Sequence, residues 1–249
     1  MAAVGVEFAK VSYTLAGSHF LLHDISLCLE AGTTTALLGR SGSGKTTLLR
    51  MVNGLVTPTS GEVRVVDRRV GDYDVVALRR SIGYVIQETG LFPHMTVERN
   101  ARIALELAGR SRAEISTRAE EVLSLVGLDY AVFRERYPWQ LSGGQRQRVG
   151  LARALAMDPD ILLMDEPFGA LDPLTRAEMQ TMLRELLQRV GKTVLLVTHD
   201  LDEALYLAQR VVFLAEGEVV ADLAACDVLM SNNLHVKDYA SAVHRAVPA

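Results

Sequence analysis

The sequence has little cysteine, no excess of basic charge and no long apolar run. Each of these absences argues against a class of function. Its two cysteines, Cys28 and Cys226, lie far apart and lack the spacing of metal ligands, so we expect reduced thiols in a cytoplasmic protein. Lysine and arginine number 26 against 30 aspartates and glutamates, which leaves a net charge of -4. That balance gives no electrostatic argument for a nucleic-acid partner.

Signals for membrane insertion are also missing. No stretch approaches the roughly 18 consecutive apolar residues that a spanning helix needs. The first ten residues lack the basic and apolar regions of a signal peptide. We therefore expect a soluble protein, so that any role at a membrane has to come through a partner.

Short apolar runs organise most of the chain. The 249 residues, 49% of them hydrophobic, are enough for one large α/β domain or two small ones. Apolar runs bounded by glycine, proline or charge predict buried strands of a largely parallel sheet. These runs are residues 35–38, 82–86, 161–164, 194–197 and 211–214. Helical patterns such as 173–190 lie between them, and this alternation indicates a layered α/β fold.

Two regions depart from that alternation. Residues 4–13 and 21–30 partly alternate, and with residues 61–66 they predict a small antiparallel sheet. Residues 96–155 are mostly helical by pattern and interrupt the succession of strands. We interpret residues 89–158 as a helical subdomain inserted into a core formed by residues 1–88 and 159–249.

Residues 39–46 fit the phosphate-loop pattern G-x-x-x-x-G-K-[ST], between a predicted strand and a helical run. Lys45 is expected to reach the β- and γ-phosphates, and the Thr46 hydroxyl to ligate Mg²⁺. An ordinary glycine-rich turn is the alternative, since the pattern arises by chance in about one chain in a hundred. The predicted nucleotide-binding residues here are Gly39, Arg40, Ser41, Gly42, Ser43, Gly44, Lys45, Thr46 and Thr47.

Two further predicted strands end in polar residues. Residues 161–164 lead into Asp165 and Glu166, at the strand end where open α/β sheets present ligand groups. Asp165 can hold Mg²⁺ through its water shell, and Glu166 can accept a proton from an attacking water. Residues 194–197 lead to His199. A lone histidine is as often structural, but this position favours contact with a γ-phosphate.

A second glycine-rich helix start lies at residues 141–145, Leu-Ser-Gly-Gly-Gln. Ser142 would serve equally well as an ordinary N-cap. The two glycines also make a second phosphate-facing site, far in sequence from the first. One chain has no evident need for two such sites for one nucleotide, whereas two chains facing each other do.

Here the sequence resembles the ABC ATPase family over nearly its whole length. Residues 141–145 match the LSGGQ signature of that family in full, and the other motifs follow in family order. The resemblance implies an α/β, P-loop NTPase (RecA-like) core with a small N-terminal antiparallel β-subdomain and an inserted helical subdomain. Residues 1–249 would form a single ABC ATPase domain that binds ATP and Mg²⁺ and hydrolyses ATP.

The resemblance also implies roles for single residues. Tyr13 looks like the aromatic residue that stacks on adenine, with packing in an N-terminal strand as the alternative. Gln87 resembles the glutamine that reaches Mg²⁺ or the attacking water. Glu166 resembles the catalytic base and His199 the switch histidine. With Lys45 and Gln87 they make up the expected catalytic set.

In this family the phosphate loop of one chain and the signature of another enclose each ATP. Carried over to this chain, the signature residues would bind the ATP held by the phosphate loop of a partner. We therefore expect a second ATPase subunit, in a homodimer when ATP is bound. The predicted signature contacts are Ser142, Gly143, Gly144 and Gln145.

Residues 83–97 and 165–176 look like bacterial import ATPases, in particular the osmoprotectant group for glycine betaine, choline and carnitine. The resemblance implies integral membrane permease partners, an extracytoplasmic solute-binding protein that acts indirectly, and a place at the cytoplasmic face of the membrane. The cargo rests on analogy, because an ATPase subunit does not touch it. The tail from residue 222 shows no regulatory motif, so we expect no CBS-type regulation.

Other functions stay open at this point. ABC ATPases that act on ribosomes or nucleic acid carry two cassettes or a long coiled coil, and this chain shows one cassette without a heptad run. Another importer, or an exporter, is the alternative within transport. A simple P-loop kinase has no need of the motif at residues 141–145.

Overall fold

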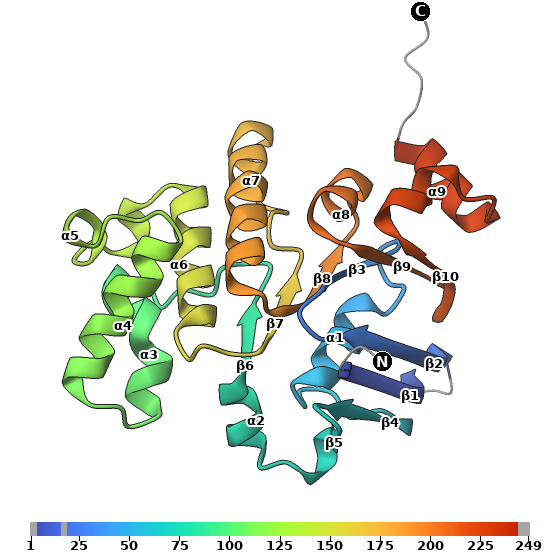
Figure 1. Cartoon of the computed structure of the whole chain (residues 1–249), viewed down its shortest axis with the longest axis horizontal. Helices are drawn as coiled ribbons and strands as arrows, with labels where there is room; N and C mark the ends of the chain where they lie inside the picture. The colour runs from blue at the N-terminus through green and yellow to red at the C-terminus, as the bar shows by residue number, and fades with distance from the viewer. Residues whose placement is uncertain (1–3, 16–18, 244–249) are drawn as a thin grey trace, which may run out of the picture. The chain divides into compact units, whose positions relative to one another are not determined.

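The computed structural model describes residues 4–15 and 19–243 of the chain, shown as a ribbon in Figure 1. The chain divides into two compact units. Unit 1 comprises Met1–Tyr73 and Thr193–Ala249, and unit 2 comprises Asp74–Lys192. Each unit contains strands and helices, which confirms the predicted α/β class. The finer boundary predicted for the helical subdomain, 89–158, stays a prediction.

Unit 1 contains the predicted antiparallel sheet. Its strands are β1 (Val4–Leu15), β2 (His19–Glu30), β4 (Ser60–Val65) and β5 (Arg68–Arg69), in the order β2-β1-β4-β5. Period-two alternation buries one face of β1, β2 and β4, and Phe8 of β1 lies opposite Val63 of β4 with both side chains buried. This pairing explains why residues 4–13 alternate in the sequence.

The parallel strands of unit 1 explain the short apolar runs. β3 (Thr34–Leu38) pairs in parallel with β8 (Thr193–Thr198) and β9 (Arg210–Ala215), while β10 (Glu218–Ala224) adds to β9 in the antiparallel direction. Every residue of β3 and β8 is buried, which requires apolar side chains on both faces.

Three helices of unit 1 follow or cover these strands. They are α1 (Lys45–Val52), α8 (Leu201–Leu207) and α9 (Leu234–Val243), and the last follows the 3₁₀ turn η3 (Ala225–Met230). Residues of β3, α8, β9, η3 and α9 share one apolar cluster. Burial of Val236 of α9 in this cluster attaches the C-terminal helix to the sheet.

Unit 2 contains the parallel strands β6 (Ile82–Val85) and β7 (Ile161–Asp165). Its helices are α2 (Val75–Ser81), α3 (Val97–Leu107), α4 (Arg112–Leu125), α5 (Tyr130–Phe133), α6 (Gly143–Leu155) and α7 (Pro173–Val190). Helices α3, α4 and α6 contact one another pairwise, as the green and yellow-green ribbons in Figure 1 show. The observed bounds of α7 are those that the apolar spacing predicts.

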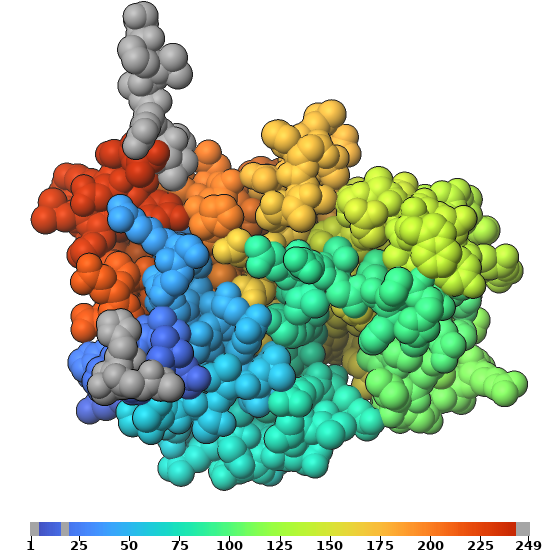
Figure 2. Space-filling model, turned by 180° about the vertical axis from the view of Figure 1, so that it is seen from behind, coloured from blue at the N-terminus to red at the C-terminus, as the bar shows by residue number. Residues whose placement is uncertain are grey.

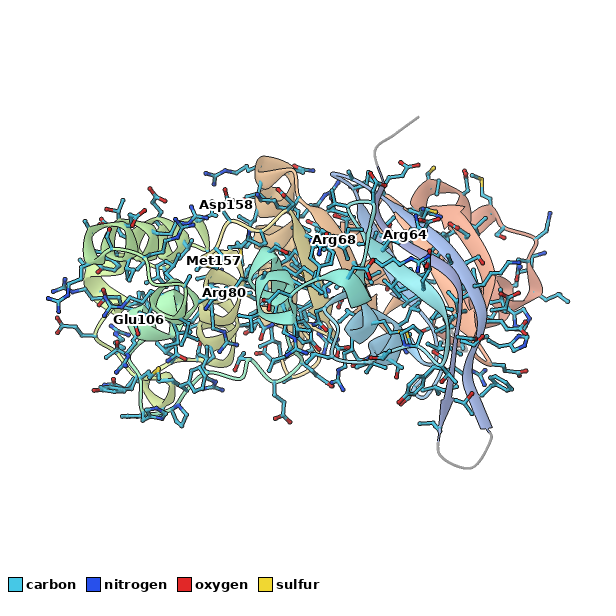
Figure 3. The ribbon with its side chains drawn as sticks, turned by 90° about the horizontal axis from the view of Figure 1, so that it is seen from below. Arg64, Arg68, Arg80, Glu106, Met157 and Asp158 are labelled. Carbon is cyan, nitrogen blue, oxygen red and sulfur yellow. The ribbon has the colours of Figure 1, made fainter. Side chains whose placement is uncertain are left out.

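The C-terminal ends of these helices are closed by side chains. Arg118 of α4 donates to the main-chain oxygens of Leu155, the last residue of α6, and of its C-cap Ala156. Arg80 of α2 donates from Nη2 to the carbonyl of Leu107 at the end of α3, 2.6 Å away (Figure 3). Because the last carbonyls of a helix lack internal partners, these cations stabilise both ends.

The sequence patterns missed several short or exposed elements. Few residues are buried in β5, β10 and α2, so these elements have no apolar run from which they could be predicted. Strand β6 ends at Val85, one residue before the predicted end at Ile86. Among the described residues, no helix combines the length and the apolar character needed to cross a bilayer.

Candidate nucleotide site

The phosphate-loop residues lie in unit 1: residues 39–44 connect β3 to α1, and residues 45–47 form the first turn of α1. Gly44 is the N-cap of α1 with φ of 98°, a left-handed conformation that glycine adopts without strain. Lys45 is 5% exposed, and its Nζ donates to the carbonyls of Gly39 at 2.7 Å and Arg40 at 2.8 Å. The ammonium group is therefore held inside the loop by two of the loop's own carbonyls.

Two glycines of this loop have no room for a side chain. A Cβ on Gly39 would overlap the carbonyl oxygen of Leu214 in β9. A Cβ on Gly44 would lie 2.5 Å from Cδ2 of Leu22. Leu22 is also opposite Tyr13 in the β1–β2 register, so Leu22 links the strand of Tyr13 to the start of α1. Tyr13 itself is half-buried.

His199 follows β8 in the same unit. Its side chain is exposed, and its main-chain oxygen accepts a hydrogen bond of 2.6 Å from the hydroxyl of Tyr239 in α9. Asp200 caps α8 by accepting from the Glu203 amide at 3.0 Å, while its own amide donates to Oγ1 of Thr198 at 3.0 Å. The turn that carries His199 is thus held by neighbours in sequence and by α9.

A pocket of about 410 Å³ lies beside the phosphate loop within unit 1. Residues 39–43 form one side, and residues 213–216 of β9 and the following turn form another. His235, Asp238 and Tyr239 of α9 complete it. Figure 2 shows the light-blue loop and helix next to the red C-terminal segment, in agreement with these lining residues.

The predicted carboxylates Asp165 and Glu166 lie in unit 2 at the end of β7. Asp165 is the last residue of the strand and is 5% exposed, with Oδ2 3.5 Å from the hydroxyl of Tyr84 in β6. Glu166 follows, and its Oε2 lies 3.4 Å from Nε2 of Gln87. Gln87 comes two residues after the end of β6, so the parallel pairing of β6 and β7 brings the two side chains together.

Glu166 has an unusual backbone conformation. Its φ is 46°, in the left-handed region that costs a residue with a side chain about 1 kcal/mol. The carbonyl of Glu166 accepts from the Gly169 amide at 3.2 Å, which closes a tight turn directly after the strand. Such local strain is typical of residues whose orientation serves a site.

The signature motif begins α6 in unit 2. Ser142 is its N-cap: Oγ accepts from the Gln145 amide at 3.2 Å, and Oε1 of Gln145 accepts from the Ser142 amide at 3.0 Å. The capping role left open by the sequence is therefore present. Gly144 is buried, and a Cβ there would lie 2.7 Å from Cγ2 of Thr175 in α7. Gly143 is more open, with a Cβ position 3.3 Å from Leu171.

Sequence reasoning missed Arg153, which links α6 to the segment after Gln87. Its guanidinium donates to the carbonyls of Thr89 and Gly90, both at 2.7 Å. Burial lowers the pKa of Arg153 below its ordinary value. A lone arginine in the apolar stretch 151–155 was the available signal. Tyr84 contacts Asp165, and Tyr239 contacts His199. The sequence did not point to either tyrosine, because each partner is distant in sequence.

The expected metal ligands are not a preformed all-protein cage. Over residues 4–15 and 19–243, no group of three or more His, Cys, Asp or Glu side chains could hold a metal ion. Mg²⁺ commonly binds through one or two carboxylates together with substrate phosphates and water. A buried carboxylate at a strand end, as at Asp165, fits that kind of site.

Comparisons with known proteins agree with these motifs. A family model described as ABC transporter matches residues 22–169. The chain belongs to the ABC transporter family. It is 49% identical over 215 residues to the glycine betaine uptake system ATP-binding protein YehX of Escherichia coli, covering 86% of this chain and 69% of that protein. It is 50% identical over 223 residues to the sulfate/thiosulfate import ATP-binding protein CysA of Brucella melitensis, covering 88% of this chain and 59% of that protein.

A solved structure shows the same fold for an ABC cassette. The dimeric ATP-binding cassette MJ0796, bound to ADP and Pi, superposes with a TM-score of 0.78 at 36% identity, covering 88% of this chain and 98% of that chain. The predicted P-loop NTPase fold is thereby confirmed. Against other relatives, named as carnitine, choline or osmoprotectant transport ATP-binding proteins, this ABC chain spans 52% to 58% of their length.

Proposed function

We propose that the chain is the ATP-hydrolysing subunit of an ABC importer. The observation that carries this proposal is the pairing of Gln87 and Glu166, 3.4 Å apart, beyond the ends of two parallel strands and next to the buried Asp165. An amide that holds a carboxylate at a strand end is suited to orient a general base towards a water. Family membership and the cassette fold support ATP as the substrate.

The remaining residues take the roles that the resemblance gives them. The loop from Gly39 to Thr47 would bind the phosphates, with Lys45 as the cation and the backbone of a helix start as the anion site. Thr46, Gln87 and Asp165 would hold Mg²⁺, which neutralises phosphate charge when it is bound. His199 would contact the γ-phosphate, and Tyr13 would stack on adenine.

We further propose that the chain works as a dimer. Residues 142–145 form a second helix start with glycines, suited to the phosphates of an ATP held by another copy. The dimeric state of MJ0796 supports this arrangement. Integral membrane permease subunits would be partners of the chain, and the chain would lie at the cytoplasmic face of the membrane. A solute-binding protein would act indirectly.

The cargo that we propose is a quaternary amine such as glycine betaine. Its support is the similarity to YehX and to other relatives named for carnitine and choline transport. The similarity to CysA makes sulfate or thiosulfate the second candidate. Uptake of labelled glycine betaine and of labelled sulfate by host cells that lack this chain would separate them, because only the true cargo should lose uptake.

The test of the ATPase proposal is Glu166→Gln. The variant should bind Mg·ATP and form a dimer detectable by light scattering, but its turnover should fall by at least about 100-fold because the general base is lost. Glu178→Gln, on an exposed position of α7, is the matched control and should keep the wild-type rate. Wild-type turnover in Glu166→Gln would contradict the assignment of the base.

The test of the membrane partner uses the same variant. Glu166→Gln protein with ATP should capture a polytopic membrane protein from detergent-solubilised membranes of the host. Recovery of ribosomes or nucleic acid without a membrane protein would contradict transport and leave the ATPase chemistry standing.

A further inference from the structure

The N-terminal part of helix α9 is joined to the sheet of unit 1. Near its start, Asn233 accepts from the His235 amide at 2.9 Å and donates to the carbonyl of Val220 in β10 at 2.8 Å. Further along, Val236 is 1% exposed in the cluster formed with α8 and β9. The helix is therefore placed by apolar burial and by hydrogen bonds to the sheet.

Tyr239 bridges two parts of that unit. Its ring meets Phe213 of β9 edge to face, with centroids 5.9 Å apart and an interplanar angle of 78°. Its hydroxyl donates to the main-chain oxygen of His199 at 2.6 Å, across 40 positions of sequence. A packed aromatic ring has few rotamers, so the hydroxyl is presented at a defined place.

The bond falls on the residue proposed to contact the γ-phosphate. Thr198 ends β8 and is buried, while Asp200 begins the cap of α8. His199 lies between these two residues, and its side chain is exposed. Small displacements of a catalytic group lower the rate steeply, because the reaction needs a narrow range of geometry.

We propose that Tyr239 is a positioning residue for ATP hydrolysis: its hydroxyl fixes the main chain of His199, so that α9 sets the turnover rate. This inference rests on the proposed function. The role of Tyr239 is to act through the orientation of His199, to whose main chain its hydroxyl donates. Helix α9 lines the pocket beside the phosphate loop, and its Tyr239 donates to the main chain of His199. The helix therefore lies beside both parts of unit 1 that carry predicted phosphate contacts.

The first arm of the test compares two tyrosine hydroxyls. Tyr239→Phe keeps the ring against Phe213 and removes the hydroxyl that donates to His199. We expect kcat for Mg·ATP to fall about three- to tenfold, the effect of one hydrogen bond, with KM unchanged within about twofold. The matched control is Tyr73→Phe, whose hydroxyl donates to the carbonyl of Val65 at 2.8 Å and whose ring packs under Arg68 (Figure 3).

Tyr73→Phe should lose a similar amount of stability, measured by thermal unfolding, and keep the wild-type kcat. An unchanged kcat in Tyr239→Phe would overturn the inference. An equal fall in kcat for both variants would also overturn it, because the loss would then be one of general stability.

The second arm asks whether Tyr239 acts through His199. Single-turnover hydrolysis is measured in His199→Ala and in the double variant with Tyr239→Phe. The second substitution should change nothing further, because the group that it positions is gone. A further fall as large as in the wild-type background would overturn the inference, as would a wild-type rate in His199→Ala.

The wild-type chain distinguishes the two proposals. If it does not hydrolyse Mg·ATP, the proposed function fails and the inference fails with it. If it hydrolyses Mg·ATP and Tyr239→Phe matches its kcat, the inference alone fails.

Discussion

The two helix starts that carry the phosphate motifs are built in different ways. Among the described residues, α1 begins at Gly44 without a side-chain cap, in a loop held by Lys45 and by close contacts of glycine. Helix α6 begins at Ser142 with a complete capping box, in which Gln145 returns the hydrogen bond. The first start relies on backbone geometry that suits a polyphosphate. The second is organised by its own side chains.

We propose from this difference that the two helix starts have separate roles: the start of α1 binds the nucleotide of its own chain, and the start of α6 meets the nucleotide of a second chain. The loop of unit 1 would need its cation and its glycines for nucleotide affinity, because phosphate charge must be balanced there. The start of α6 has its own capping box, which suits a surface that would meet ATP only when a second chain brings it.

Lys45→Ala should separate the two helix starts most strongly. Loss of the ammonium group removes a charged hydrogen-bond donor, so the affinity for Mg·ATP should fall by about 10- to 100-fold in isothermal titration calorimetry. Ser142→Ala should bind ATP like the wild type in the same measurement, since the proposed partner of Ser142 is the nucleotide of another chain. Equal losses of affinity in both variants would contradict separate roles for the starts of α1 and α6.

Ser142→Ala tests whether the capped start also serves dimerisation. Removal of an N-cap serine should lower the free energy of unfolding by about 1 kcal/mol in urea denaturation. Ser111→Ala is the matched control, because Ser111 forms the same capping box with Glu114 at the start of α4. Both should lose similar stability, whereas only Ser142→Ala should weaken ATP-dependent dimerisation of Glu166→Gln protein. Intact dimerisation in the Ser142 variant would confine that serine to capping.

Asp158→Asn examines the other end of α6 and should have the smallest effect. Asp158 follows α6 in the left-handed region, with φ of 52°, and its carboxylate lies 2.9 Å from Nζ of Lys192 and 3.7 Å from Nη2 of Arg118 (Figure 3). The hydrogen bond from Lys192, and then the charges of Lys192 and Arg118, lower the pKa of Asp158 below its ordinary value of 3.8. Asparagine tolerates the same backbone conformation.

A lowered pKa stabilises the fold above the pKa of the unfolded chain and loses that contribution as the pH falls through the folded value. The free energy of unfolding of the wild type should therefore exceed that of Asp158→Asn by at most about 1 kcal/mol in urea denaturation at pH 7, because the carboxylate is exposed and screened. The difference should shrink as the pH falls below 3.8. A difference that is constant down to pH 2 would show that charge is not its cause.

Much of the fold could be predicted from residue patterns. Strands buried on both faces, such as β3 and β8, need unbroken apolar runs, and α7 is bounded by Pro173 and Gly191, whose backbone preferences start and end a helix. Exposed elements such as β10 and α2 were missed, because a polar exposed segment leaves no periodic apolar signal.

The residues proposed to carry the chemistry could also be found in the sequence, because the phosphate loop, the signature and the Asp165–Glu166 pair are local motifs whose spacing suffices to name them. The side chains that support these motifs could not be found there and depend on the tertiary fold. Tyr239 meets His199 across 40 positions, and Arg153 meets Gly90 across 63. Periodicity reports the burial of each segment, whereas such partners depend on which segments the packed core brings together.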